Sequence, residues 1–123
     1  MKTTDKPILQ NFHLEGVGHI LPEDACEAHK SNRAVLIDVR EEYEWETERI
    51  DGVLFHPMQQ IAQWLPTLHR NQNIIVYCHK GIRSTHVAQF LKNQGFPYAL
   101  NMDGGISAWK ARGLPVTKPL EHS

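Results

Sequence analysis

The sequence is poor in cysteine, with only Cys26 and Cys78 among its 123 residues. Two cysteines are too few for the disulfide framework of a small secreted domain, although one bridge between them stays open. Long hydrophobic runs are also lacking, so we find neither a signal-peptide core near the start nor a segment of membrane-spanning length. We therefore expect a cytoplasmic protein that does not insert into a membrane.

An excess of charge of either sign is absent as well, because 13 basic residues face 14 acidic ones and the formal net charge is −1. This balance gives no long-range attraction to nucleic acid, so nucleic acid is not predicted as a partner. A small anionic substrate would need a local positive site. His56, His69 and His86 show no paired ligand spacing, and Cys78 has no second cysteine or histidine placed for zinc, so no metal is predicted.

The length, with 41% hydrophobic and 22% charged residues and no internal repeat, is typical of one soluble domain. Residues 1–12 are polar and contain Pro7, which predicts a flexible N-terminal arm. We expect the domain itself to span residues 13–118, followed by a tail over residues 119–123.

Two short apolar runs dominate the domain, Ala34–Ile37 before Asp38 and Ile74–Tyr77 before Cys78. Both lack polar alternation, which is typical of parallel strands covered on both faces. Weaker strands are expected near residues 18–20, 53–55 and 99–102. Helical patterns lie between the strands, at residues 22–29, at 61–68 with a break at Pro66, at 87–94 and at 106–111. This alternation predicts an α/β domain with a mainly parallel central sheet of about five strands and helices on both faces.

Asp38 and Cys78 each follow a buried strand directly, so we expect them at the same edge of the sheet, where α/β proteins form their sites. Trp64 and Trp109 are interpreted as core residues, and Cys26 as a packing residue within a helix. The acidic run 41–48 is interpreted as the solvated face of a helix.

The segment Cys78–Ser84 runs from a strand into a helix and suits the binding of an anion. Such a turn points backbone N–H groups inward, and the new helix adds the positive end of its dipole. Gly81 permits unusual backbone angles, Lys80 and Arg83 add positive charge, and Ser84 is a candidate helix cap. A site of this kind stabilises a thiolate, the nucleophilic form of cysteine, whereas the alternative is a buried structural cysteine.

The Cys78 loop resembles the active-site loop of the rhodanese family, in which four residues separate a cysteine from an arginine, here Cys78 and Arg83. Further family motifs occur in the same order: Leu36-Ile37-Asp38-Val39-Arg40-Glu41 with Tyr43 and Glu44, then Asp51-Gly52-Val53, Met102-Asp103-Gly104-Gly105-Ile106-Ser107-Ala108-Trp109 and Gly113-Leu114-Pro115-Val116. The likeness extends from about Gly16 to Thr117. One departure is Arg49 and Asp51, where the family commonly has histidine and proline.

The resemblance implies a rhodanese-like fold and a sulfurtransferase that needs no metal or organic cofactor. Cys78 would take sulfur from thiosulfate or a similar anionic donor and hold it as a persulfide. Cyanide, a thiol or an acceptor protein would then remove the sulfur. The implied site is the loop that surrounds this cysteine, with residues that brace the loop from the neighbouring strand: catalytic Cys78; loop and substrate-binding His79, Lys80, Gly81, Ile82 and Arg83; supporting Asp38 and Arg40.

Three other functions stay open at this point. Phosphatases and arsenate reductases on the same fold also use a cysteine and an arginine, but with five residues between them rather than four. Regulatory or scaffold domains of the family typically lack the cysteine that is present here. The protein could also relay persulfide sulfur to a partner protein, with thiosulfate only incidental.

Overall fold

A five-stranded parallel sheet forms the centre of the computed structural model, which describes residues 1–119. The strands follow the order β1-β5-β4-β2-β3, and every neighbouring pair is parallel. Their bounds are β1 Gly18–Ile20, β2 Val35–Asp38, β3 Leu54–Phe55, β4 Ile74–Tyr77 and β5 Ala99–Met102. The predicted parallel sheet of about five strands is confirmed.

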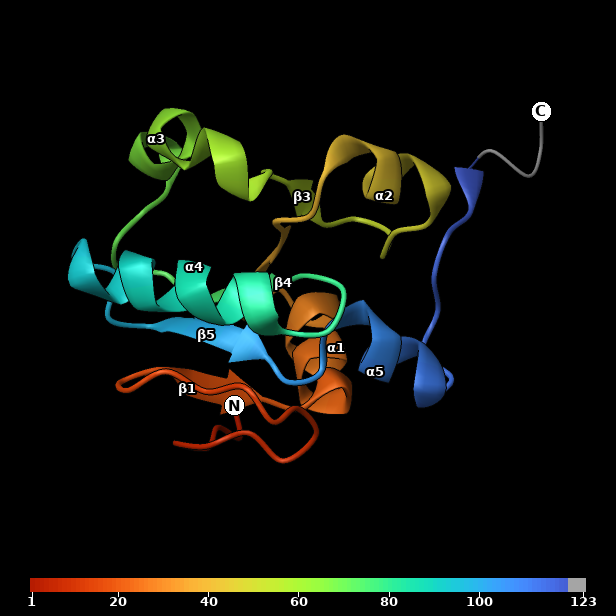
Figure 1. The fold of residues 1–123 in the computed structure, drawn as a ribbon, viewed down its shortest axis with the longest axis horizontal. Helices are drawn as coiled ribbons and strands as arrows, with labels where there is room; N and C mark the ends of the chain where they lie inside the picture. Colours follow the sequence, from red (N-terminus) through yellow and green to blue (C-terminus); the bar gives the residue numbers. More distant parts are fainter. Residues whose placement is uncertain (120–123) are drawn as a thin grey trace.

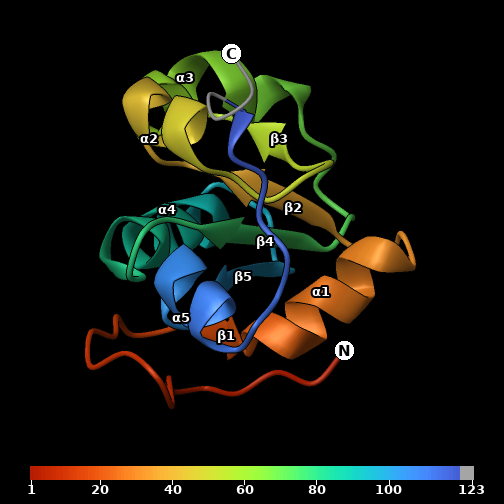
Figure 2. The same ribbon diagram turned by 90° about the vertical axis from the view of Figure 1, so that its right-hand side faces the viewer.

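The helices connect the strands and cover both faces of the sheet. They are α1 Pro22–Lys30, α2 Glu42–Thr47, α3 Ile61–Trp64, α4 Ile82–Asn93 and α5 Gly105–Ala111, with 3₁₀ turns η1 Met58–Gln60 and η2 Leu65–Thr67. Figures 1 and 2 show α4 on one side of the sheet and α1 on the other. The helix expected over residues 61–68 is interrupted at Pro66, as the sequence predicts, because α3 ends at Trp64 and a 3₁₀ turn that contains Pro66 follows.

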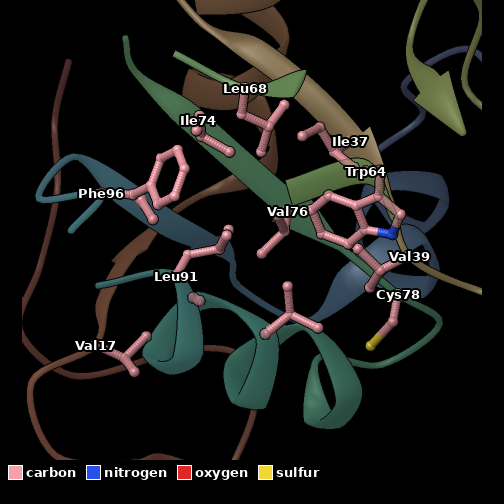
Figure 3. Close-up of a cluster of buried hydrophobic side chains, with 13 residues drawn as sticks. Val17, Ile37, Val39, Trp64, Leu68, Ile74, Val76, Cys78, Leu91 and Phe96 are labelled. Carbon is pink, nitrogen blue, oxygen red and sulfur yellow. The ribbon is translucent and has the colours of Figure 1, made fainter. Parts of the chain in front are cut away.

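The core has two layers because successive side chains of a strand point to opposite faces of the sheet. In β4, Ile74 and Val76 pack toward α4, where they meet Val87 and Leu91. Figure 3 shows this layer, which also contains Trp64. The opposite layer holds Ile75 and Tyr77 of β4 with residues of α1 and α5, including Cys26 and Trp109. Cys26, Trp64 and Trp109 are all buried, in agreement with their interpretation as packing residues.

The segment before β1 lies against the domain, which differs from the flexible arm expected from the sequence. Thr4 and His19 exchange backbone hydrogen bonds of 2.9 and 2.8 Å. The N–H groups of Ile8, Leu9 and Gln10 donate to the buried carboxylate of Asp103 at 2.6, 3.0 and 3.0 Å. Because backbone N–H groups make these contacts whatever the side chains are, the composition of the segment does not reveal a partner so distant in the sequence.

At the other end of the chain, the tail expected over residues 119–123 lies outside the described residues from position 120 onward. Within residues 1–119, no helix is both long and apolar enough to cross a membrane.

Candidate active site

Cys78 follows β4 directly and lies at the carboxyl edge of the sheet, as predicted. Its Sγ accepts hydrogen bonds from the backbone N–H groups of Gly81 and Ser84, at 3.1 and 3.4 Å, and lies 3.3 Å from the Ser84 hydroxyl. The residue is only 1% exposed, and Figure 3 shows its sulfur turned from the strand end toward α4. The two N–H donors favour a negative charge on this sulfur.

Helix α4 begins at Ile82, and Gly81 is its cap residue with a φ of 104°. This left-handed conformation explains the need for glycine at position 81. Ser84 therefore lies inside the first turn, so its prediction as a helix cap is wrong. Its hydroxyl faces Cys78 on one side and Asn101 of β5 on the other, at 2.6 Å from the amide oxygen.

The first turn of α5 is hydrogen-bonded to the Cys78 loop. The N–H of Ile106 donates to the carbonyl of Cys78 at 2.9 Å, and the N–H of Ser107 donates to the carbonyl of His79 at 3.0 Å. Gly105 permits this close approach, because a Cβ there would lie only 2.4 Å from the His79 carbonyl oxygen. The carbonyls of Cys78 and His79 are thus both bound by α5.

Several loop N–H groups have no internal partner. Those of His79, Lys80, Ile82 and Arg83 make no hydrogen bond within the part of the chain that the structure describes. These groups flank the turn that holds the Cys78 sulfur. They are therefore free to stabilise an anion bound at the loop.

Arg83 forms a two-pronged ion pair with Glu44 of α2, with N–O distances of 2.7 and 2.9 Å. The hydrogen bonds and charge of Glu44 raise the pKa of Arg83 above its ordinary value, although burial opposes this. Partial burial acts to raise the pKa of Glu44, yet the Arg83 hydrogen bonds and the N–H of Glu41 lower it. Both groups stay charged at neutral pH, so Glu44 is not part of a purely solvated acidic face as the sequence analysis expected.

Asp38 and Arg40 form a buried ion pair at the end of β2, with exposed side-chain fractions of 0% and 5%. The Arg40 guanidinium donates to both Asp38 oxygens, at 2.8 to 3.1 Å, and to the Glu48 carbonyl at 2.6 Å. Burial acts to lower the pKa of Arg40, but the hydrogen bonds and charge of Asp38 raise it. The pair is therefore not a surface ion pair, and it joins the end of β2 to the end of α2.

Of the remaining predicted residues, His79 and Lys80 lie on the loop and Ile82 begins α4, and all three are exposed. His79 lines a cavity of about 390 Å³ between α2 and α5, together with Arg40 and Glu44. Lys80 and Ile82 line a different depression, of about 430 Å³, bordered by Gln10 and α5. The structure thus places the two predicted substrate contacts, His79 and Lys80, on different sides of the loop.

Three residues near Cys78 were missed or misread from the sequence: Gln10, Glu44 and Asn101. Asn101 carried a usable signal, because it is a polar residue within an otherwise apolar strand, and the structure shows that it is fully buried. Gln10 carried none, since it lies in a polar segment far from the loop in sequence. Within residues 1–119, no group of three or more His, Cys, Asp or Glu side chains is placed to hold a metal ion.

The sequence profile of the Rhodanese-like domain family matches residues 21–112. The chain belongs to the rhodanese-like domain family. The family predicted from the loop motifs is thereby confirmed, and the match includes both Cys78 and the Asp38–Arg40 pair.

Relatives of this chain carry names that agree with sulfur transfer. A "Sulfurtransferase" of Allochromatium vinosum is 33% identical over 85 residues, which cover 69% of this chain and 79% of that protein. The "Thiosulfate sulfurtransferase GlpE" of Actinobacillus succinogenes is 32% identical over 97 residues, covering 79% and 87%. Among solved structures, a rhodanese-related protein from Thermoplasma volcanium superimposes with a TM-score of 0.73 at 27% identity, covering 80% of this chain and 96% of that one.

Proposed function

We propose that this protein is a sulfurtransferase that carries the transferred sulfur as a persulfide on Cys78. The observation that carries the proposal is the convergence of two backbone N–H groups on Cys78 Sγ, within a loop that belongs to the rhodanese-like family. Donors fixed in this way stabilise a charged sulfur without further rearrangement of the loop. The names of the relatives support thiosulfate as a donor.

The first chemical step is a displacement at sulfur. The Cys78 thiolate attacks the outer sulfur of thiosulfate, the bond between the two thiosulfate sulfurs breaks, and sulfite leaves with the electron pair. The product is a persulfide on Cys78 whose terminal sulfur carries the negative charge. The unpartnered N–H groups of the loop, which include those of Lys80 and Ile82, support that charge.

The second step reverses the roles. An acceptor such as cyanide or a thiol attacks the terminal sulfur, and the Cys78 thiolate leaves with the electron pair. Both steps are nucleophilic displacements, so the cycle balances without an oxidant or a reductant.

The acceptor can be identified by isolating the persulfide form and exposing it separately to cyanide, small thiols or a protein thiol. This experiment distinguishes an enzyme that transfers sulfur to small acceptors from a relay to a partner protein.

Exposure to thiosulfate followed by intact-mass measurement tests the proposal directly. We expect the protein to gain the mass of one sulfur atom, and peptide mapping to place it on Cys78. Cyanide should then restore the original mass. A protein that gains no sulfur, or gains it on Cys26, would contradict the proposal.

We expect Arg83→Ala to lower kcat/KM for thiosulfate by about tenfold or more, because it frees Glu44 as an unpaired carboxylate beside the anion site. Lys80→Ala should mainly raise the KM, since Lys80 is an exposed cation beside the loop that attracts an anionic donor without contacting the sulfur. Steady-state kinetics of thiosulfate:cyanide transfer separate these two effects.

The matched control is Arg112→Ala. Arg112 also forms an ion pair with a carboxylate, since its Nε donates to both oxygens of Glu23 at 2.8 and 2.9 Å, but it lies at the far end of α5 from the Cys78 loop. That variant should keep its kinetics. Equal losses in the Arg83 and Arg112 variants would show that the Arg83–Glu44 pair has no special relation to the reaction.

Phosphate-ester hydrolysis is the rival that the loop length argues against. Only four residues separate Cys78 from Arg83, and a phosphoryl group would bring three oxygens into a ring sized for one sulfur. We expect no measurable hydrolysis of aryl phosphates at enzyme concentrations where sulfur transfer is readily measured. Efficient hydrolysis by the unmodified protein would reverse this ranking of the two chemistries.

A further inference from the structure

The Ser84 hydroxyl lies between two acceptors but has only one hydrogen to donate. Its Oγ is 2.6 Å from the Asn101 amide oxygen and 3.3 Å from Cys78 Sγ. Ser84 and Asn101 are both fully buried, so water does not supply a second donor. The orientation of the hydroxyl therefore depends on which way the Asn101 amide points.

The Asn101 amide is oriented by Gln10 of the N-terminal segment. Gln10 Oε1 accepts from the Gly104 N–H at 2.8 Å, and Gln10 Nε2 donates to the Phe12 carbonyl at 2.8 Å and to Thr85 Oγ1 at 2.9 Å. Backbone groups on both sides thus fix which end of the Gln10 amide is oxygen. Because Gln10 Oε1 also contacts the Asn101 side chain at 3.0 Å, Asn101 must present its NH₂ group there.

His19 on β1 agrees with the same orientation. Asn101 Nδ2 lies 3.1 Å from His19 Nδ1, and His19 Nε2 lies 2.9 Å from His13 Nδ1. Burial and the neighbouring His13 lower the pKa of His19, although Asp103 opposes this, so the ring is neutral. A neutral His19 accepts at Nδ1 and donates from Nε2 to His13, and this leaves the Asn101 oxygen facing Ser84.

We propose that Gln10 and Asn101 are positioning residues that hold the Ser84 hydroxyl turned away from Cys78, so that charging the sulfur requires this hydroxyl to turn back. With an uncharged thiol, Ser84 donates to Asn101 and its lone pairs face Cys78. With an anionic sulfur, the hydroxyl turns to the sulfur and the Asn101 oxygen loses its donor. The N-terminal segment thereby opposes the charged state of Cys78.

The relevance of this device to sulfur transfer rests on the proposed function, since both the attacking thiolate and the persulfide are anions. The device itself concerns only the thiol. It predicts that loss of the Gln10 amide lets Asn101 turn over, so that its NH₂ group faces Ser84 and the hydroxyl is free to donate to the sulfur. His19 and His13 can follow this change by exchanging neutral tautomers.

Alkylation of Cys78 by iodoacetamide across a pH series tests the proposal, in a Cys26→Ser background that leaves one thiol. Gln10→Met keeps the length of the side chain over the loop but removes its amide. We expect it to raise the alkylation rate constant at neutral pH about threefold to tenfold, because a hydroxyl donor to charged sulfur is gained. The plateau rate at high pH should stay unchanged, since it reports access to a fully ionised thiol.

The same change in a Ser84→Ala background is the control, and there the effect of Gln10→Met should vanish. Asn101→Leu, which removes the competing acceptor, should act in the same direction and also depend on Ser84. If Asn101→Leu does not fold, Gln10→Met gives the answer alone. An equal effect with and without Ser84, a higher plateau rate, or no change at neutral pH would overturn the proposal.

The charged and titratable groups near the Cys78 loop are the same in all the variants compared. They are Arg83 of α4 with its partner Glu44 of α2, the Asp38–Arg40 pair and Tyr77 at the strand ends, and His79 and Lys80 of the loop. Because alkylation needs no sulfur donor, its outcome is independent of whether thiosulfate forms a persulfide. The two proposals can therefore fail separately.

Discussion

Replacement of Cys78 by alanine is expected to reduce thiosulfate:cyanide sulfur transfer to the background of the uncatalysed reaction. Each turnover proceeds through a covalent bond to this sulfur, and no other side chain of the loop offers a nucleophile of the same kind. The fold should survive, because alanine removes only the sulfur from a residue at the edge of the core layer. Steady-state assays of thiocyanate formation measure the effect.

Cys26→Ser is the matched control. Cys26 is also buried, at 5% exposure, but it packs in the layer between α1 and the opposite face of the sheet. The Cys26→Ser change should lower the free energy of unfolding and leave the rate constants of sulfur transfer nearly unchanged. Turnover that persists in the Cys78→Ala protein, or that disappears in the Cys26→Ser protein, would show that the persulfide is not carried on Cys78.

The central strands were predictable because their burial dictates their composition. The run Ile74–Tyr77 is fully buried in the middle of the sheet, and its predicted bounds coincide with those of β4. At the edge, β3 spans only Leu54–Phe55, one residue shorter than the segment 53–55 that was expected. The cap of α4 was expected at Ser84 but is Gly81, because the first turn of the helix belongs to the polar loop and lacks the apolar periodicity of a buried face.

The candidate site was predictable where its residues follow strands and less so where partners come from elsewhere. Asp38 and Cys78 both lie at the carboxyl ends of strands in one parallel sheet, so their common edge follows from topology. In the sequence, Glu44 looks like an exposed acidic residue of a helix, and only the packing of α2 beside Arg83 reveals its ion pair. Gln10 lies at the loop because the N–H groups of residues 8–10 bind Asp103, a contact that the sequence separation of 93 to 95 residues hides.

Replacement of Gly105 by alanine is the second change from which we expect a large effect. Its φ is +65°, and a Cβ would meet the His79 carbonyl oxygen at 2.4 Å and the Cys78 carbonyl oxygen at 2.7 Å. Both contacts are to backbone, and α5 is hydrogen-bonded to these same carbonyls through Ile106 and Ser107, so neither side can move alone. Gly105→Ala should therefore push the loop from α5 and displace Cys78 from its donors.

The expected result is a loss of about a hundredfold in kcat/KM, because small displacements of a reacting group cost about that much. Urea unfolding should show a loss of roughly 2–5 kcal/mol, from about 1–2 kcal/mol for a left-handed alanine and about 1–3 kcal/mol for the forced contact. Gly113→Ala separates the two causes, since Gly113 has a φ of +72° but a Cβ at that position would meet nothing within 4 Å. The Gly113→Ala protein should lose only the about 1–2 kcal/mol that a left-handed alanine costs, and it should keep its activity. If both alanine variants lose activity equally, the close approach of α5 to the Cys78 loop is not what positions the sulfur.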